Sequence, residues 1–137
     1  MSKNIKALIA AGGTGGHVLP GINLAYFLLE KKYSVKIITD KRGYNFLNEK
    51  DKKNVSVFLS SPLNKKNYLS IIFSLFLIFY SILRSLIFLL SYRPNIIFGM
   101  GGYASFPICI AAAILRVKFV IYENNLIIGR ANKKLIP

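Results

Sequence analysis

Two glycine-rich segments are the part of this sequence whose residue types best suit the binding of an anion. Residues 11–17 read Ala-Gly-Gly-Thr-Gly-Gly-His, and residues 99–107 read Gly-Met-Gly-Gly-Tyr-Ala-Ser-Phe-Pro. Glycine lets the backbone approach a ligand closely, and the N–H groups in the first turn of a helix attract phosphate. We therefore expect the two segments to bind a phosphorylated group, and as a pair they suit a diphosphate better than either alone.

The first segment also permits other interpretations. It lacks the Gly-Lys-Ser/Thr of a P-loop, and Val18 stands where a dinucleotide fingerprint has its third glycine. Asp40 follows the next expected strand and could imitate the acid that binds a ribose, so a nicotinamide-binding oxidoreductase fragment is one alternative. A tight turn without any ligand is another, although four glycines and His17 are more than a turn needs.

A third polar segment begins with Tyr122-Glu123-Asn124-Asn125 and continues with Gly129-Arg130-Ala131-Asn132-Lys133. It brings a carboxylate and several amides to the end of an expected strand. Polar residues in such places are often only turn formers or caps. A binding role for this segment is therefore supported chiefly by the presence of the two glycine segments.

The elements that must position these residues follow from hydrophobic patterning. We expect strands at residues 5–10, 35–39, 55–59, 96–99 and 119–122, and helices at 20–31, about 44–49, 68–92, 104–115 and 127–135. Alternating strands and helices predict an α/β fold with a Rossmann-like parallel sheet. In the order 3-2-1-4-5 the first and fourth strands are neighbours, so both glycine segments should meet at the switch point where such sheets bind ligands.

Composition narrows the classes of function. The formal net charge is +14, from 19 lysines and arginines against five acids. Such an excess attracts polyanions, although codon bias toward lysine, isoleucine and asparagine would also produce it. The basic residues are dispersed without aromatic interleaving, so we expect no nucleic-acid partner. One cysteine, Cys109, and one histidine predict no metal site and no internal disulfide. We expect no signal peptide and a reducing cytosolic setting.

The segment from residue 68 to residue 92 is long and apolar enough to consider a membrane. Arg84 is its only charge, and its polar side chains fall within an arc of roughly 120° on a helix: Ser70, Ser74, Ser81, Arg84, Ser85 and Ser91. We favour a helix that packs on the sheet and dips into the bilayer interface over a buried core helix or a true span. Lys65, Lys66, Arg84 and Arg93 would then contact anionic headgroups.

Taken together and in this order, the three motifs resemble the MurG family along the whole chain. That resemblance implies a bacterial inverting glycosyltransferase (hexosyltransferase) of GT-B fold in peptidoglycan synthesis, peripheral on the cytoplasmic face of the inner membrane. The implied reaction moves N-acetylglucosamine from UDP-N-acetylglucosamine to undecaprenyl-diphosphate-linked muramyl pentapeptide, which converts lipid I into lipid II. No cofactor is implied.

The resemblance also implies roles for individual residues. Contacts to the UDP-sugar are implied for Thr14, Gly15, Gly16 and Asn125, with Asn132 as a further substrate-binding residue. The acceptor diphosphate would be bound by Gly12, Gly13, Gly101, Gly102, Tyr103 and Ser105. His17 would be the general base for the attacking hydroxyl, kept neutral by the helix N-terminus, or it would only order its loop, with Glu123 as the alternative base.

Two departures from the family pattern bear on function. Where the family has His-Glu-Gln-Asn, this chain has Tyr122-Glu123-Asn124-Asn125. We also expect residues 1–137 to be the amino-terminal, acceptor-binding domain alone, either truncated or half of a split enzyme whose partner binds the donor. The isolated chain should then be inactive. An alternative is a non-catalytic subunit that recruits a catalytic partner to the membrane.

Overall fold

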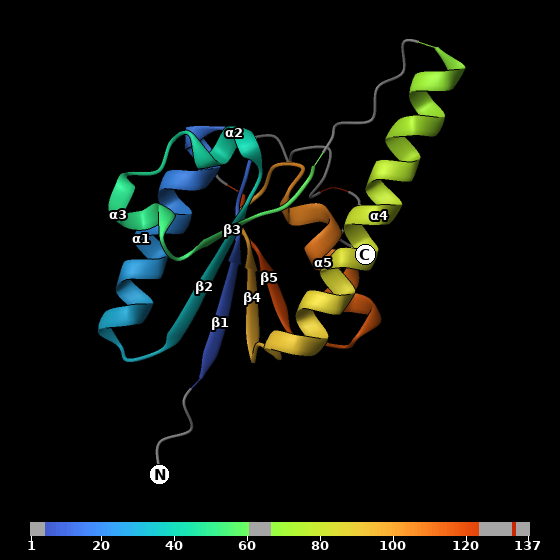
Figure 1. The fold of residues 1–137 in the computed structure, drawn as a ribbon. Helices are drawn as coiled ribbons and strands as arrows, with labels where there is room; N and C mark the ends of the chain where they lie inside the picture. Colours follow the sequence, from blue (N-terminus) through green and yellow to red (C-terminus); the bar gives the residue numbers. More distant parts are fainter. Residues whose placement is uncertain (1–4, 61–66, 124–132, 134–137) are drawn as a thin grey trace.

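The computed structural model describes residues 5–60, 67–123 and 133 of the chain. In this part a single parallel sheet is formed by β1 (Lys6–Ala10), β2 (Ser34–Thr39), β3 (Val55–Val57), β4 (Ile96–Gly99) and β5 (Phe119–Ile121). The strand order is β3-β2-β1-β4-β5, and every pairing is parallel (Figure 1). The predicted α/β class and strand order are confirmed.

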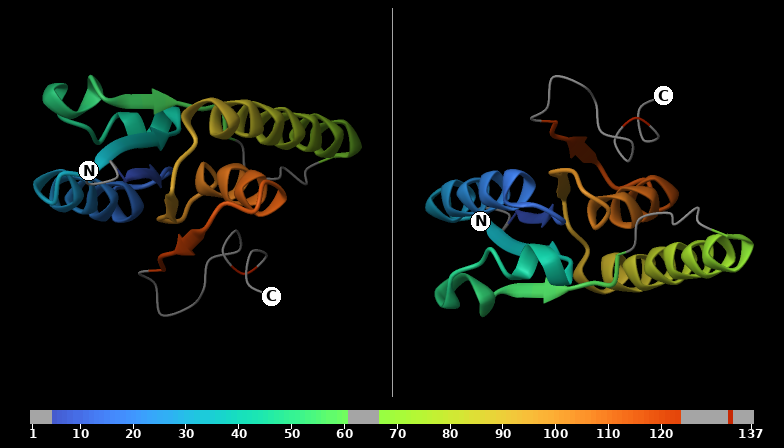
Figure 2. Two further views of the ribbon diagram at one scale, coloured as in Figure 1. Left: turned by 90° about the horizontal axis from the view of Figure 1, so that it is seen from below. Right: turned by 90° about the horizontal axis from the view of Figure 1, so that it is seen from above.

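Helices cover both faces of this sheet (Figure 2). On one face α1 (Gly15–Glu30) packs against a cluster that contains Ala7, Ile9 and Ile37. On the other face α4 (Tyr68–Tyr92) and α5 (Ser105–Ile114) pack against Leu8, Ile38 and Ile97. Residues of β1 alternate between the two clusters, and Ala7 to Ala10 are fully buried, as expected for a central parallel strand.

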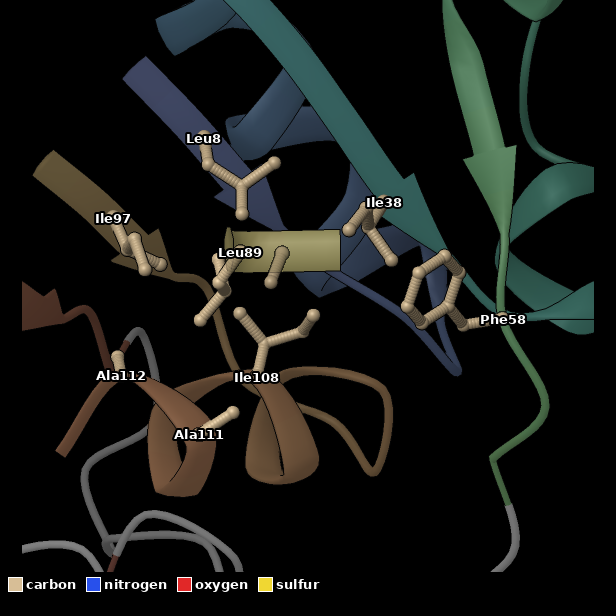
Figure 3. Packing of buried hydrophobic residues seen from close by; sticks show 9 residues of the cluster. Leu8, Ile38, Phe58, Leu89, Ile97, Ile108, Ala111 and Ala112 are labelled. Carbon is tan, nitrogen blue, oxygen red and sulfur yellow. The ribbon is translucent and has the colours of Figure 1, made fainter. Parts of the chain in front are cut away.

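The cluster beneath α4 and α5 joins elements far apart in the sequence. Leu89 from α4 and Ile108 from α5 meet Leu8 and Ile97 of the sheet, while Phe58 closes the side next to β2 (Figure 3). Large-to-small changes in such a core commonly lower the free energy of unfolding by about 2–5 kcal/mol. This core fixes the ends of β1 and β4, which carry the two glycine loops.

Several predicted boundaries were wrong. The first helix begins at Gly15, with Thr14 as its N-cap, so Pro20 lies inside the helix and does not start it. The single helix expected near residues 44–49 is replaced by two four-residue helices, α2 (Lys41–Tyr44) and α3 (Glu49–Lys52). The reason for α2 is Asp40, whose side chain accepts a hydrogen bond from the Gly43 N–H as an N-cap. The third strand ends at Val57, and the helix expected at residues 127–135 lies outside the described residues apart from Lys133.

The orientation of α4 is opposite to that of an ordinary surface helix. Its buried residues are Ser74, Ser81, Ser85 and Leu89, so its small polar stripe faces the protein. The Ser81 hydroxyl donates to the Leu59 carbonyl at 2.7 Å, and that of Ser85 donates to the Ser81 carbonyl at 2.6 Å. The outward face carries large apolar side chains, namely Leu69, Ile72, Phe73, Leu75, Phe76, Phe79, Leu83, Ile87 and Leu90.

The length and hydropathy of α4 would allow it to cross a membrane, but only 17% of its most apolar 18-residue stretch is buried within the protein. The interpretation as a buried core helix is therefore wrong. The amino-terminal half of α4 extends beyond α5, away from the body of the domain (Figure 1). The helix ends as predicted, at a left-handed Arg93 followed by Pro94.

Candidate functional site

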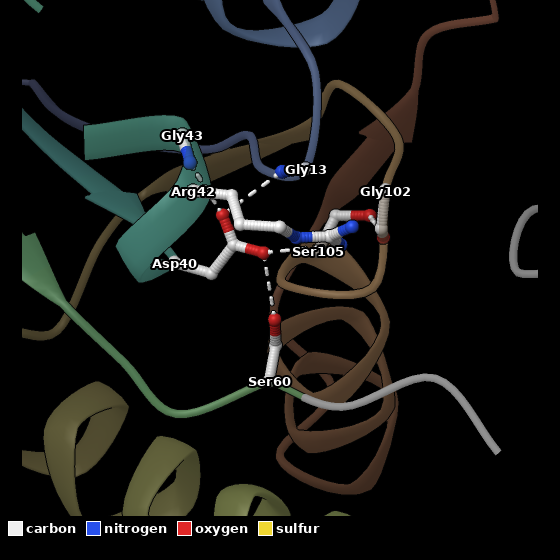
Figure 4. Close-up of polar contacts among 7 residues, drawn as sticks. All are labelled: Gly13, Asp40, Arg42, Gly43, Ser60, Gly102 and Ser105. Atoms are coloured by element: carbon white, nitrogen blue, oxygen red, sulfur yellow. Dashed lines mark hydrogen bonds and ion pairs between the residues drawn. The ribbon is translucent and has the colours of Figure 1, made fainter. Parts of the chain in front are cut away.

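The first glycine loop, between β1 and α1, is held by the carboxylate of Asp40. One carboxylate oxygen, Oδ1, accepts hydrogen bonds from the N–H groups of Gly13 at 2.9 Å and Gly43 at 2.8 Å (Figure 4). The other, Oδ2, accepts from the Ser60 hydroxyl at 2.9 Å. Asp40 is 3% exposed. The loop is therefore bound to the ends of β2 and β3 through one buried side chain.

The environment of Asp40 decides between its ionised and neutral forms. Burial by itself would raise the pKa of the carboxyl group, but the hydrogen bonds from Gly13, Gly43 and Ser60, with the charge of Arg42, outweigh burial and lower the pKa. The group is an anion at neutral pH, and its oxygens already accept hydrogen bonds from the protein. This explains Asp40 as a brace for the loop and the N-cap of α2, and it removes the reason for assigning it to a ribose.

The second glycine loop, between β4 and α5, depends on two left-handed glycines. Gly101 has a φ of +94° and Gly102 a φ of +77°, a backbone region that other residues enter only at a cost in free energy. The Ser105 hydroxyl donates to the Gly102 carbonyl at 2.9 Å, and Ser105 is fully buried. Ser105 therefore orders this loop from beneath, whereas Tyr103 is exposed on its surface.

The two loops pack directly against each other. A side-chain carbon on Gly12 would lie 2.6 Å from the Ala104 Cβ, and one on Gly102 would overlap the Gly12 carbonyl oxygen. A carbon on Gly101 would lie 2.7 Å from Nδ1 of His17. The ends of β1 and β4 thus bring both loops together at one edge of the sheet, at the place where the topology predicted them.

His17 lies in the first turn of α1, beneath the second loop. Its Nδ1 is buried and has no hydrogen-bond partner within the part of the chain that the structure describes. A proton acceptor in this position would use Nε2, because Gly101 covers the other nitrogen. A catalytic histidine usually has a third group that orients its second nitrogen, and the described residues supply none.

The remaining sequence-predicted residues surround these loops. Thr14 and Gly16 are exposed at the start of α1. Gly15 is half-buried, next to Phe46. Glu123 follows β5, whose end stays beside β4 because the Tyr122 N–H donates to the Gly99 carbonyl at 2.8 Å. Asn125 and Asn132 lie outside the described residues.

Sequence reasoning missed the group formed by Asp40, Arg42 and Ser60. The available signal was an aspartate at a strand end three residues before a glycine, the spacing of an N-cap. Among the described residues no cluster of histidine, cysteine or acidic side chains could hold a metal ion. Burial raises the pKa of the Cys109 thiol to about 12, so it is not a reactive thiolate.

A Rossmann-like sheet with two apposed glycine loops at its switch point is the architecture of the amino-terminal half of a GT-B glycosyltransferase. The chain belongs to glycosyltransferase family 28, since residues 7–136 match the N-terminal domain of that family.

Curated relatives give the same result. The chain is 39% identical over 133 residues to the UDP-N-acetylglucosamine--N-acetylmuramyl-(pentapeptide) pyrophosphoryl-undecaprenol N-acetylglucosamine transferase of Pelagibacter ubique (strain HTCC1062). It is 37% identical over 137 residues to the enzyme of the same name in Rhizobium etli (strain CIAT 652). These alignments cover 95% and 100% of this chain but 36% of each relative, so the chain spans about a third of their length.

Solved structures confirm the fold. MurG of Acinetobacter baumannii superposes with a TM-score of 0.74 at 24% identity, over 96% of this chain and 37% of that one. A UDP-N-acetylglucosamine 2-epimerase superposes with a TM-score of 0.62 at 12% identity, over 98% of this chain and 35% of the other.

Proposed function

We propose that this chain is the acceptor-binding part of a transferase that moves N-acetylglucosamine from UDP-N-acetylglucosamine to the undecaprenyl-diphosphate-linked muramyl pentapeptide, lipid I. The observation that carries the proposal is the direct packing of the loop at Gly12 and Gly13 against the loop at Gly101 and Gly102. The curated relatives named for this reaction support the choice of substrates. The domain is proposed to work with a donor-binding domain such as the remaining two-thirds of those relatives would contain.

In the proposed reaction a hydroxyl of the lipid-linked sugar attacks the anomeric carbon of the donor. The new C–O bond forms as the bond to UDP breaks, the hydroxyl proton passes to a base, and UDP leaves with the electron pair. The glycine loops, with Tyr103, would hold the acceptor diphosphate, while Thr14, Gly15, Gly16, Asn125 and Asn132 would contact the donor. Because its Nε2 remains for proton transfer, His17 is the first choice for the base, and Glu123 is the second.

The same proposal places the chain on the cytoplasmic face of the inner membrane through α4. The outward apolar face of this helix would enter the bilayer interface, and the +14 charge would favour anionic lipid. A peripheral position agrees with an acceptor whose lipid tail stays in the bilayer while its diphosphate reaches the glycine loops.

The decisive experiment measures transfer of labelled N-acetylglucosamine to lipid I in detergent or vesicles. We expect negligible product from the isolated chain, because GT-B chemistry occurs between two domains. Addition of a donor-binding domain in trans, or fusion to it, should restore transfer. Substantial turnover by the purified chain alone would contradict the acceptor-half assignment.

A non-catalytic membrane-recruiting subunit is the second candidate, and the exposed face of α4 favours it. This candidate predicts that His17 and Glu123 can both be replaced without loss of transfer, provided the partner still reaches the vesicles. The acceptor-half proposal predicts that at least one of these replacements abolishes transfer while recruitment persists. The two candidates are therefore separated by one pair of variants.

A further inference from the structure

Arg42 lies next to the first glycine loop with its guanidinium held in place from below. Its Nη2 is 3.6 Å from Oδ2 of Asp40, a carboxylate oxygen that is itself fixed by the Ser60 hydroxyl. The Arg42 side chain begins in α2, whose first turn is capped by the same aspartate. Two separate contacts of Asp40 thus fix both the backbone and the charged end of Arg42.

The guanidinium is also open to a ligand. The Arg42 side chain is 58% exposed, whereas that of Asp40 is 4% exposed. A side-chain carbon on Gly13 would lie 3.4 Å from the Arg42 Nη2, so the guanidinium covers the bare side of that glycine (Figure 4). Gly12, the neighbour of Gly13, packs against Ala104 of the second loop, so Arg42 lies beside the loop that contacts the second one.

The charge balance at the loop gives Arg42 a second effect. Asp40 is a buried anion hydrogen-bonded to the Gly13 N–H, and by itself it would repel a phosphate bound at the same backbone. Arg42 compensates that charge while more than half of its side chain stays exposed. Guanidinium donors match phosphate oxygens in a bidentate arrangement, which backbone N–H groups alone do not provide.

We infer that Arg42, positioned by Asp40, binds the diphosphate of the lipid-linked acceptor beside the glycine loops. This inference rests on the proposed function for the identity of the acceptor. Arg42 comes from α2, the short helix after β2, and so belongs to neither of the two glycine loops. Diphosphate could also come from the UDP of the donor, so the test must separate the two sources.

The test measures binding of farnesyl diphosphate, inorganic pyrophosphate and UDP to the full chain by isothermal titration calorimetry. Arg42→Gln should weaken farnesyl diphosphate and pyrophosphate by roughly 10- to 100-fold, as expected for loss of a charge-assisted hydrogen bond. Binding of UDP should change by less than about 3-fold. Arg42→Lys should recover part of the affinity, because it restores the charge without the fork.

Lys41→Gln is the matched control. Lys41 is exposed and neighbours Arg42 on the same short helix, so this variant removes the same charge without touching the loop. Equal losses for both variants would overturn the inference, because net charge alone would then explain them. A loss confined to UDP, or no binding of either diphosphate probe by the unaltered chain, would also overturn it.

Circular dichroism melting of each variant shows whether the fold is kept. Failure of the proposed function gives a different pattern: diphosphate binding would still depend on Arg42, but lipid I would receive no sugar when the donor domain is added. Conversely, sugar transfer could occur while Arg42→Gln leaves the diphosphate affinity unchanged. That result would support the proposed function and contradict only the inference about Arg42.

Discussion

The imidazole of His17 occupies the space that a side chain on Gly101 would need, because a carbon added to Gly101 would lie only 2.7 Å from the histidine Nδ1. The histidine lies in the first turn of α1, directly after the first glycine loop, and the glycine lies in the loop after β4. The position of each loop therefore depends on the other, so a substitution in either loop should alter the structure of both.

Gly102→Ala tests this coupling. The alanine would adopt a left-handed conformation and overlap the Gly12 carbonyl, so we expect unfolding free energy to fall by about 1–3 kcal/mol or more. Diphosphate affinity should fall with it. Gly16→Ala, at an exposed helical position, should leave stability unchanged or raise it slightly. Urea denaturation measures the free energy of unfolding. Equal values for Gly102→Ala and the unaltered chain would contradict the described packing.

His17→Ala tests the base in the reconstituted two-domain transferase. Loss of a general base should lower kcat by about 10²–10⁴-fold with a much smaller effect on KM, since a base acts mainly in the transition state. If only KM changes, His17 orders its loop or binds substrate. The proton acceptor would then be sought at Glu123.

Asp40 should dominate the loss of stability in acid. Its pKa is lowered on folding from an ordinary value near 3.8, so its contribution is full above about pH 4 and disappears as pH falls through the lower folded pKa. The sequence has five acids, all within the described residues, and Asp40 is the buried one. Asp40→Asn should lower unfolding free energy at pH 7 by about 1–3 kcal/mol and flatten its decline below pH 4. Denaturant titrations from pH 3 to pH 7 measure both effects, and an unchanged acid limb would contradict them.

In α4, replacing a buried serine with a large apolar residue should destabilise the fold, whereas replacing an exposed aromatic residue with serine should not. Ser85→Leu places a large side chain at a fully buried position and should lower unfolding free energy by about 1–3 kcal/mol. Phe76→Ser removes an apolar side chain that is 63% exposed and should change stability by less than about 0.5 kcal/mol. Thermal melts of the two variants give the comparison. A larger loss for Phe76→Ser would mean that this face is covered.

Vesicle binding should depend on the outward face of α4 and on anionic lipid together. The double change of Phe76 and Phe79 to serine should reduce partitioning by at least about 10-fold, because each ring contributes apolar area. Phe27→Ser, at an exposed site on α1, is the control for lost aromatic area and should have little effect. Salt should weaken co-sedimentation of the unaltered chain by screening. Equal pelleting with neutral and anionic vesicles at every salt concentration would contradict the electrostatic part.

The strand order and the meeting of the glycine loops could be predicted because the relevant signals are local. Short β-branched runs followed by glycine mark buried parallel strands, and right-handed crossovers leave few topologies. The start of α1 could not be found in the same way. Pro20 favoured a later start, whereas the Thr14 carbonyl accepts the Val18 N–H at 3.1 Å and begins the helix among the glycines.

The hydrogen bonds of the Asp40 carboxylate could not be predicted from the sequence for a different reason. Its partners Gly13 and Ser60 are far from it in the chain, and only folding brings them to one carboxylate. Similarly, the polar arc of residues 68–92 could be predicted, but not which way it faced. Small serines let the backbone of α4 approach the rest of the domain closely. Packing therefore favours them inside, even though their hydroxyls must then find carbonyl partners.

The outward face of α4 also governs how the chain behaves in water without a membrane. Two such faces can cover each other, so we expect the chain to self-associate when no membrane is present. The net charge of +14 opposes this by repulsion between molecules, and the repulsion extends only about one Debye length. Raising ionic strength should therefore loosen the chain from anionic lipid while promoting its aggregation.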